Sequence, residues 1–473
     1  MSETLTPGIC VIGGGTGGIA AARASAALGV ATVLVERHMV GAHSGGVRSK
    51  ALAAAGRRAA LVREAADFGV KAPAVEVDFA RVRQHLREAA AATAPNDAPE
   101  RLAALGIRVI QGAAKFKDRR TVTVGDEIEI RARRFVIATG SLPAVPPIPG
   151  LDSGPYLTAE MVLDLNELPR HIVVIGGEPI GLELAQALRR LGSNVTVLTP
   201  KAPLADDDPE AAAIVLAQLE REGVAIRSGV TVTGVGHVGE RVSVGIDSDG
   251  KAESVDGSHL LVAAGRRPHI DGLDLEAAHI RHDVTGILVN RELRTSNRRV
   301  FAIGDVAAGH PNSAQAAAYH ASLVIQRTLL GHRVSANDTL APRVTYTEPE
   351  LAQVGLTEAQ ARAAGLTIRL VRWPYHDNDR AQAERAGRGH IKIVTDRKGV
   401  VLGATIVGSH AGELIGAWSP AVAHGLNLGV FADLVLPYPT LSEMGKNAAM
   451  DFAAPRLTRS WVRRIISFIR NLG

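Results

Sequence analysis

Three glycines near the start of the chain are spaced to hold a nucleotide. Gly13, Gly15 and Gly18 follow an apolar segment over 9–12 and precede an alanine-rich stretch. In this spacing the first glycine makes a tight turn, the second lets the backbone approach a pyrophosphate, and the third permits close helix packing. The N-terminus of the following helix offers free N–H groups to the phosphates. Glu36, which closes the next apolar segment, is placed to accept a hydrogen bond from a ribose hydroxyl.

The same pattern occurs a second time. Gly176 and Gly181 follow another apolar segment, and the apolar segment after them closes at Thr199. Gly176 and Thr199 are 23 residues apart, as are Gly13 and Glu36. Two such units in one chain predict two bound nucleotides, with electrons passing between them.

Strands and helices are needed to position these turns. Each unit has a later apolar segment that ends in small residues, at Thr139 and Gly140 in the first and at Gly265 in the second. A further apolar segment, over 300–304, delivers Asp305 at its carboxyl end, where open α/β sheets bind ligands. The alternation of strands and helices predicts an α/β fold with two Rossmann-like dinucleotide-binding domains.

The order of these elements resembles that of the FAD-dependent pyridine nucleotide–disulfide oxidoreductases, the family of dihydrolipoamide dehydrogenase, glutathione reductase and mercuric reductase. The resemblance runs from residue 8 to about residue 455 and includes the family's α+β dimerisation domain. The segments that match this last domain are 346–350, 378–381, 402–404, 411–413 and 438–443.

The resemblance implies the cofactors and the partner. The first unit is expected to bind FAD, the second to bind NADH or NADPH, and the chain to form a homodimer. Asp305 would hold the FAD ribityl chain, Thr139 and Gly140 would lie along the same cofactor, and Ala114 would belong to the segment that contacts adenine.

The resemblance also sets the expected domain limits. The FAD-binding domain would comprise residues 1–150 and 271–335, and the NAD(P)-binding domain residues 151–270. The dimerisation domain would follow over 336–455, and residues 456–473 would form a separate basic, amphipathic tail.

The family's reaction centre is the main departure. Ahead of a Ser-Lys the family has a Cys-x4-Cys pair; this chain keeps Ser49 and Lys50 but has Gly41 and Gly46 at the cysteine positions. Cys10, the one cysteine, falls inside the first apolar segment, where we expect a small buried side chain. We therefore expect no dithiol relay, which excludes the usual route to lipoamide or glutathione and disfavours delivery of mercuric ion by thiolates.

The family's catalytic His-x4-Glu dyad is changed as well, because Tyr438 stands at the histidine position while Glu443 is kept. With no thiolate to protonate, a histidine loses its purpose, so the two departures agree. Two interpretations of Tyr438 stay open. It donates a hydrogen bond to an electron acceptor near the flavin, or it is a dimer-interface tyrosine with a satisfied hydroxyl.

The residues expected to orient the nicotinamide are retained. By the resemblance, Lys50 and Glu183 form an ion pair beside the flavin, which predicts that hydride transfer survives. Glu178, however, replaces the central glycine of the second turn. Repulsion between a carboxylate and a pyrophosphate about 5 Å away costs on the order of 3 kcal/mol of binding free energy at an effective dielectric of about 20. Either Glu178 points outward, which we favour, or the nicotinamide site is weakened.

The choice between NADH and NADPH depends on the end of the second unit's second strand. An acid there would bind the ribose 2′-hydroxyl, but Thr199 takes its place and Lys201 follows. Lys201 either meets a 2′-phosphate or is a solvated lysine. We favour the phosphate, and hence NADPH.

His43 and Arg48 fall where the redox-active loop is expected. Glycines at 41, 45 and 46 make this loop slim, which would open the flavin face to a flat acceptor. His43 is either a general acid or a solvent-facing side chain, and we favour the second interpretation. No set of His, Asp or Glu has a metal-ligand spacing, so we expect no metal site.

The net charge of +5 is confined to the tail, where residues 456–473 contain five arginines and no acid. On a helical wheel the arginines fill one half and apolar residues the other. Such a helix lies in a membrane interface or packs on the dimer, and both interpretations stay open. The rest of the chain balances to zero net charge and aromatic residues are only 3% of the chain, so we expect no nucleic-acid partner.

Composition sets the broad class. The length of 473 residues predicts several domains, and 46% hydrophobic with 21% charged residues is typical of globular proteins. With one cysteine and no apolar run long enough to span a bilayer, we expect a cytoplasmic protein, with the tail at the inner face of the membrane as the open alternative.

These observations predict an FAD-dependent NAD(P)H oxidoreductase. Hydride would pass from NAD(P)H to FAD, and electrons would go on to a non-disulfide, small-molecule acceptor such as a quinone, oxygen or a metal ion. Two alternatives stay open. One is a soluble pyridine nucleotide transhydrogenase, which needs no dithiol; the other is a catalytically impaired FAD-binding structural or sensor protein.

Overall fold

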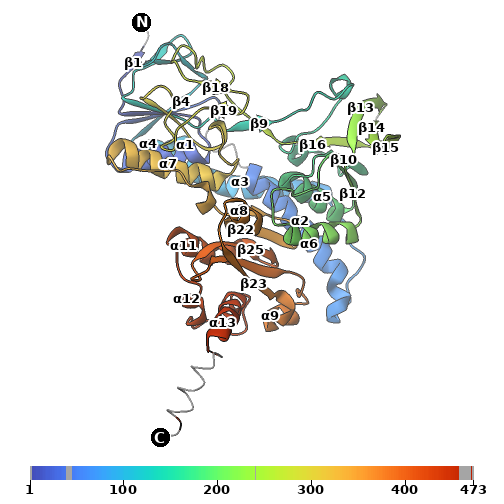
Figure 1. The fold of residues 1–473 in the computed structure, drawn as a ribbon. Helices are drawn as coiled ribbons and strands as arrows, with labels where there is room; N and C mark the ends of the chain where they lie inside the picture. The colour runs from blue at the N-terminus through green and yellow to red at the C-terminus, as the bar shows by residue number, and fades with distance from the viewer. Residues whose placement is uncertain (1–2, 39–44, 240, 458–469, 471–473) are drawn as a thin grey trace. The chain divides into compact units, whose positions relative to one another are not determined.

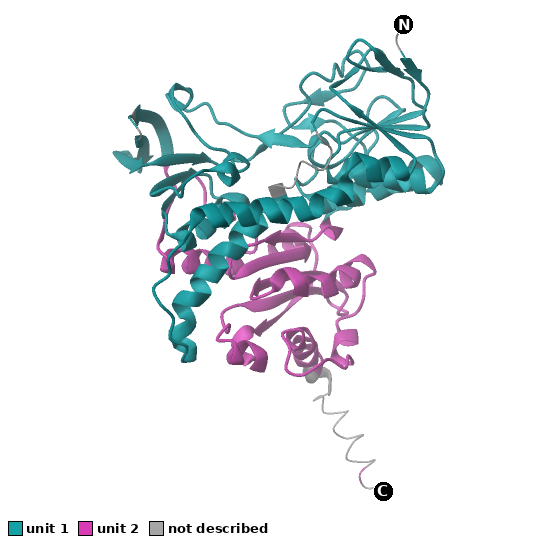
Figure 2. Ribbon diagram, turned by 180° about the vertical axis from the view of Figure 1, so that it is seen from behind, with its two compact units in different colours: residues 1–198, 231–338 teal, residues 199–230, 339–473 magenta. Residues whose placement is uncertain are grey.

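The computed structural model describes residues 3–38, 45–239, 241–457 and 470. The predicted loop residues Gly41 and His43, and residues 458–469 and 471–473 of the predicted tail, lie outside this range. The chain divides into two compact units: residues 1–198 with 231–338 form unit 1, and residues 199–230 with 339–473 form unit 2 (Figure 2).

A five-stranded parallel sheet is the framework of the first nucleotide-binding region. Its strands stand in the order β20-β8-β2-β3-β4. Their bounds are β2 Ile9–Ile12, β3 Thr32–Glu36, β4 Ile107–Gln111, β8 Arg134–Ile137 and β20 Val300–Ala302. This is the parallel arrangement that the glycine turn and apolar segments predict.

The two faces of this sheet are covered differently. Ile9 and Val11 point to the face on which helices α1 (Thr16–Ala27) and α7 (Ala314–Leu329) pack side by side (Figure 1). Cys10 points to the opposite face and joins the core formed with a smaller sheet. That sheet has the order β1-β7-β6-β5, with bounds Glu3–Leu5, Ile128–Ile130, Val122–Val124 and Ala114–Phe116.

Two long helices follow the first βαβ segment. Helix α2 spans Gly45–Glu64 and α3 spans Phe79–Thr93. Helix α2 packs closely on α5 (Pro179–Leu191), because Gly56 has no side chain: a Cβ there would lie 3.0 Å from the Ala187 carbonyl oxygen. The close approach sets α2 beside the second nucleotide-binding region.

That second region also has parallel strands. Within unit 1, β10 (His171–Ile175) pairs with β11 (Asn194–Thr199) on one side and with β16 (His259–Val262) on the other. Between β11 and β16 the chain forms an antiparallel sheet of β13, β14 and β15, with bounds Thr231–Val238, Arg241–Ser248 and Lys251–Gly257.

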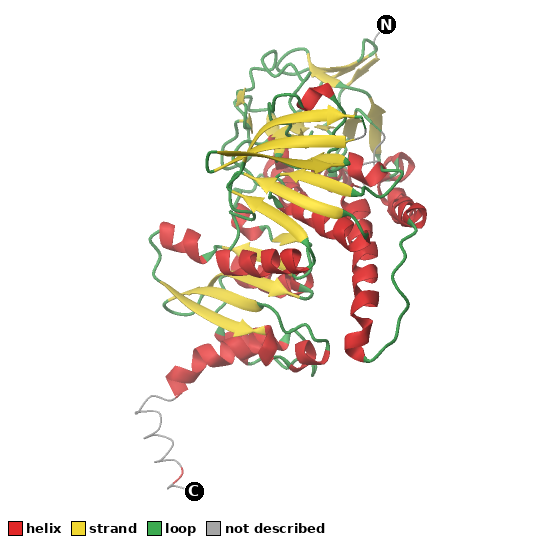
Figure 3. Cartoon of the chain, turned by 90° about the vertical axis from the view of Figure 1, so that its right-hand side faces the viewer, coloured by secondary structure: helices red, strands yellow, loops and turns green. Residues whose placement is uncertain are grey.

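Unit 2 is built on a five-stranded antiparallel sheet in the order β21-β22-β25-β24-β23. The strands are Arg343–Thr345, Glu350–Gly355, Val401–Gly408, His390–Asp396 and Ile368–Pro374, respectively. Helix α13 (Glu443–Leu457) lies across one face of this sheet (Figure 3). The core between them contains Phe452, and Trp418 stacks on Phe431 with ring centroids 4.3 Å apart.

An ion pair inside unit 2 explains why residues 199–230 pack with the C-terminal sheet. Lys392 of β24 is only 1% exposed, and its Nζ lies 2.7 Å from Oδ2 of Asp208, the N-cap of helix α6 (Pro209–Arg221). Glu210 also contacts Lys392, and Arg372 pairs with Glu210; the hydrogen bond from Arg372 lowers the pKa of Glu210 to about 2. A buried ammonium needs such carboxylates, so α6 is held to β24.

Among the described residues, no helix combines the length and the hydropathy needed to cross a membrane.

We expect Asp208→Asn to lower the free energy of unfolding by about 3 kcal/mol, because it leaves the Lys392 ammonium buried without its main countercharge. Urea denaturation followed by far-UV circular dichroism measures this loss. Arg380→Gln, which removes an exposed pair with Glu384, is the control and should cost less than about 1 kcal/mol. Equal losses of unfolding free energy in the two variants would contradict a stabilising role of the buried Asp208–Lys392 pair.

Candidate functional site

The first glycine turn leaves no room for side chains at two of its three glycines. Gly13 has a φ of +107°, and a Cβ there would lie 2.3 Å from the Ala138 carbonyl oxygen. A Cβ on Gly18 would lie 1.8 Å from the Gly13 carbonyl oxygen. Gly15, in contrast, faces open space, with no atom within 4 Å of its Cβ position. The open position is where a pyrophosphate would approach the backbone.

Glu36 is fixed beside this turn at the end of β3. Its Oε2 accepts from the Gly14 N–H at 2.5 Å, its Oε1 accepts from the His38 N–H at 2.9 Å, and the residue is 7% exposed. The carboxylate is therefore held in the place where the sequence predicts a ribose contact.

A cavity of about 450 Å³ opens next to the turn. Gly15 and Thr16, at the N-terminus of α1, line it together with Gly46 and Val47, at the N-terminus of α2. Two helix N-termini bring their N–H groups and positive dipole ends to one space, which suits a phosphate anion. Gly46 is one of the two positions where the family has cysteine.

Three other residues predicted to contact FAD, Thr139, Gly140 and Asp305, follow the carboxyl ends of the neighbouring strands β8 and β20. Asp305 follows β20, and its Oδ2 accepts from the Ser141 hydroxyl at 2.6 Å. Thr139 donates from its hydroxyl to the His269 carbonyl oxygen, and Gly140 has a φ of +69°. Ala114, at the start of β5, has its side chain buried in the core, so only its backbone is available to an adenine.

The structure brings Lys50 and Glu183 together. Lys50 lies on α2, Glu183 on α5, and the Lys50 ammonium donates to Glu183 Oε2. The Glu183 side chain is 8% exposed and that of Lys50 38%. A nearly buried carboxylate is thus neutralised by a cation that still reaches solvent, an arrangement able to orient a polar ligand between the two nucleotide-binding regions.

The second glycine turn repeats the geometry of the first at Gly176, where the φ is +124° and a Cβ would lie 2.1 Å from the Ala263 carbonyl oxygen. At Gly181 a Cβ would lie 3.0 Å from the Gly176 carbonyl oxygen, so this helix start is also tightly packed. Glu178 is exposed, as an outward side chain would be, but its Oε1 lies 3.5 Å from the Cβ position of Gly265. Its carboxylate therefore lies at the rim of the predicted nicotinamide nucleotide site.

Thr199 and Lys201 belong to unit 2. Thr199 is 5% exposed, and its hydroxyl donates to the Lys201 carbonyl oxygen at 3.1 Å, whereas the Lys201 side chain is exposed. The Thr199 hydroxyl is thus occupied by the backbone, and the Lys201 ammonium at this strand end is open to solvent.

Tyr438 has a partner that the sequence did not indicate. Its side chain is 72% exposed, and its hydroxyl donates to Asp379 Oδ2 at 2.8 Å, which raises the pKa of Tyr438. Glu443 instead accepts from the Thr440 N–H at 3.0 Å. In the described chain the tyrosine therefore pairs with Asp379 rather than with Glu443, so the spacing of the family's dyad is kept without its hydrogen bond.

Two family profiles match the sequence. The pyridine nucleotide-disulphide oxidoreductase profile matches residues 7–321, and the profile of this family's dimerisation domain matches residues 341–449. The chain therefore belongs to the pyridine nucleotide-disulphide oxidoreductases, which bind FAD and use NAD(P)H. The matched dimerisation domain supports a homodimer.

Individual relatives cover nearly the whole chain. Mercuric reductase of Streptomyces lividans is 33% identical over 456 residues, 94% of this chain and 96% of that protein. Dihydrolipoyl dehydrogenase 3 of Pseudomonas aeruginosa is 36% identical over 459 residues, 94% of this chain and 97% of that protein. The structure of LpdA from Mycobacterium tuberculosis is 27% identical with a TM-score of 0.86, covering 95% of this chain and 99% of that one. The predicted α/β fold with a C-terminal dimerisation domain is confirmed.

We expect Gly15→Val to weaken FAD binding strongly while the protein still folds. Its Cβ position is open and its φ of −78° suits any residue, but the added methyl groups would occupy the phosphate side of the turn. FAD affinity, measured by flavin fluorescence on reconstitution, should fall at least about tenfold. Gly416→Val, at another glycine with open surroundings, is the matched control and should keep FAD. Normal FAD content in Gly15→Val would contradict this placement of the cofactor.

Proposed function

We propose that this protein is an FAD-dependent NAD(P)H oxidoreductase that passes electrons to a small, non-disulfide acceptor. The retained Lys50–Glu183 pair in a chain with a single cysteine is the observation that carries the proposal. FAD, when bound, supplies the chemistry of hydride uptake and electron transfer. The chain's own residues bind the two nucleotides, orient them and determine which acceptor has access.

The single thiol is not available for a relay. Cys10 is 0% exposed in the middle of β2, and burial raises the pKa of its thiol well above the ordinary range. A thiolate is the reactive form of cysteine, so a buried, protonated Cys10 is inert. This supports direct transfer to an acceptor at the flavin, with a quinone, oxygen or a metal ion as candidates.

The region around the missing cysteines supports access of a small acceptor. Gly46 lines the cavity at the first turn without a side chain, and no atom of the described residues lies within 4 Å of its Cβ position. Arg48, one helical half-turn later, is fixed to Asp164 and to the Leu163 carbonyl oxygen. The absence of a side chain at Gly46, where the family has a cysteine, supports access of a small acceptor, and Arg48 is held away by its partners.

Two other functions fit parts of the structure. A transhydrogenase also needs no dithiol, and the Lys50–Glu183 pair would serve it equally well. An FAD-binding sensor without hydride transfer is favoured by Glu178 of the second glycine turn, because its carboxylate faces Gly265 beyond β16. The retained ion pair favours catalysis over this last function.

Anaerobic titration of the purified protein with NADPH and NADH tests the proposal. We expect one equivalent of dinucleotide to bleach the flavin absorbance, and re-oxidation by a quinone, oxygen or a metal salt to identify the acceptor. If only NAD⁺ or NADP⁺ restores the flavin absorbance after bleaching, the protein is a transhydrogenase. Bound FAD that neither dinucleotide bleaches would contradict the proposal and favour the sensor.

NADPH is proposed as the preferred donor because Lys201 is an exposed cation and Thr199 replaces the acid that would bind a 2′-hydroxyl. We expect Lys201→Ala to raise KM for NADPH about tenfold, the equivalent of one charge-assisted hydrogen bond, and to leave KM for NADH unchanged. Steady-state kinetics with both donors measure this. Lys251→Ala, at another exposed lysine, is the control, and an equal effect on both donors in Lys201→Ala would exclude a 2′-phosphate contact.

A further inference from the structure

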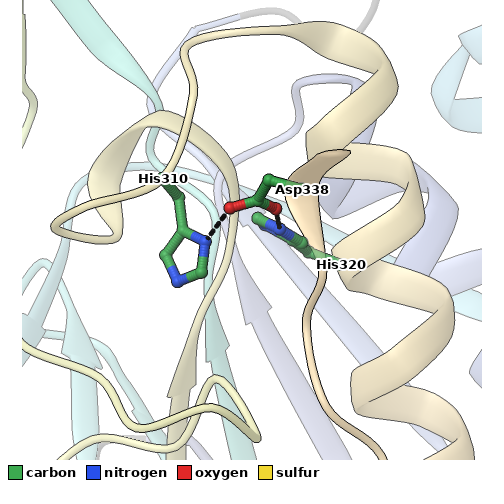
Figure 4. Close-up of side chains that lie close together, drawn as sticks. All are labelled: His310, His320 and Asp338. Atoms are coloured by element: carbon green, nitrogen blue, oxygen red, sulfur yellow. Dashed lines mark hydrogen bonds and ion pairs between the residues drawn. The ribbon is translucent and has the colours of Figure 1, made fainter. Parts of the chain in front are cut away.

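Two histidines and an aspartate, none of which the sequence pattern singles out, meet at one point in unit 1 (Figure 4). His320 lies on α7, His310 in the turn before it, and Asp338 18 residues beyond His320. His320 Nε2 lies 2.7 Å from Asp338 Oδ1, and His310 Nδ1 lies 2.6 Å from Oδ2. His320 is 0% exposed and the His310 side chain 14%. One carboxylate thus joins both rings.

The backbone determines which nitrogen of His320 carries the proton. The Gly304 N–H donates to His320 Nδ1 at 3.2 Å, so Nδ1 must present a lone pair. A neutral imidazole carries its one proton on the other nitrogen, and Nε2–H then donates to Asp338. A carboxylate only accepts, so His310 donates from Nδ1 and keeps the lone pair of its Nε2. All hydrogen bonds in the cluster are satisfied by two neutral rings and one carboxylate.

This pattern argues against a metal ion at the same place. Ligand atoms of the three residues lie within 4.8 Å of one another, as they would around a metal. A metal on His320 Nε2 would require the proton on Nδ1, where the Gly304 N–H already points. Metal-bound histidines instead donate from their second nitrogen to an acceptor. The Gly304 N–H is a donor, so the cluster suits protons and not a cation.

The hydrogen bond to Gly304 connects the cluster to the predicted FAD site. Gly304 has a φ of +65° and begins the turn η5 (Gly304–Val306), which carries Asp305. A Cβ on Gly304 would lie 2.8 Å from Cβ of Ala317, so α7 packs directly on this turn. His320, one helical turn from Ala317 on α7, fixes the Gly304 amide.

We propose that His320 is a positioning residue that holds the Gly304–Asp305 turn for FAD, and that protonation of its Nδ1 releases the turn, so that FAD is lost in acid. A proton on Nδ1 would face the Gly304 N–H, donor against donor, and the hydrogen bond would break. The inference rests on the proposed placement of FAD at Asp305.

His310 delays this release. Four titratable groups surround His320 in the described chain: His310, Asp338, Tyr319 and Asp305, which follows Gly304. The ring centroids of Tyr319 and His320 are 5.9 Å apart. Burial raises the pKa of Asp338, but hydrogen bonds from both histidines outweigh it and hold that pKa well below its usual range. Asp338 therefore stays charged. A proton on His310 Nε2 would break no hydrogen bond, and its charge would oppose a proton on the His320 ring, whose centroid is 4.7 Å away.

Release of FAD from the full-length holoprotein, followed by flavin fluorescence from about pH 8 to about pH 4.5, tests the proposal. His320→Asn keeps an acceptor at the place of Nδ1 that does not titrate in this range, and should lose the acid release. His310→Asn removes the protecting charge and should move the midpoint up by about one pH unit. Asp338→Asn removes the charge that favours protonation and should move it down. His282→Asn, at the exposed pair with Glu276, is the control.

Opposite shifts in His310→Asn and Asp338→Asn support the proposal even if His320→Asn does not fold, since both residues are more exposed than His320. Unshifted midpoints in these variants, with FAD bound at neutral pH, would overturn this inference alone. Absence of FAD at neutral pH would instead overturn the proposed function. Calorimetric binding of Zn²⁺ that is lost in His310→Asn would assign the cluster to a metal and overturn the inference.

Discussion

The ion pair between Lys50 and Glu183 is the constraint on which the arrangement of the nucleotide-binding regions depends. A carboxylate that is 8% exposed is stable only beside a cation, so Glu183 on α5 requires Lys50 on α2. The two helices must therefore stay in contact, and Gly56 permits this by letting α2 approach the backbone of α5. The N-termini of both helices lie at the same end of this pair, next to the two glycine turns. The one interaction thus joins the packing of α2 on α5 to the proposed orientation of the nicotinamide.

The departures from the family's reaction centre form a consistent set. Gly46 has no side chain where the family has a cysteine, and Cys10 is buried in β2. Tyr438 donates a hydrogen bond to Asp379. A histidine beside Glu443 serves to exchange protons with a thiol. A phenol whose pKa is raised by an adjacent carboxylate serves this poorly, because it stays protonated. Loss of the thiols and loss of the base therefore both support the proposed change of electron acceptor.

The sequence predicted the strands and glycine turns, because short-range patterns along the chain specify them. Apolar segments followed by glycine turns located β2, β10 and the strands ending at Gly140 and Gly265, since strand, turn and helix are local in the chain. The resemblance supplied the Lys50–Glu183 pair across 133 residues. It did not supply the Asp208–Lys392 pair, the Tyr438–Asp379 hydrogen bond or the cluster around Asp338. These join residues that are far apart or separated by irregular turns, where no periodicity links one side chain to its partner.

Glu178 decides how strongly the nicotinamide nucleotide is held. Its carboxylate lies beside Gly265, so it faces any pyrophosphate that binds at the N-terminus of α5. Because the residue is exposed, water screens the repulsion, and the cost approaches about 1 kcal/mol instead of the several kcal/mol of a buried pair. The positive end of the α5 dipole offsets a similar amount. The two terms nearly cancel, so we expect Glu178 to leave the proposed nicotinamide site open, which favours the proposed enzyme over a protein that has lost its electron donor.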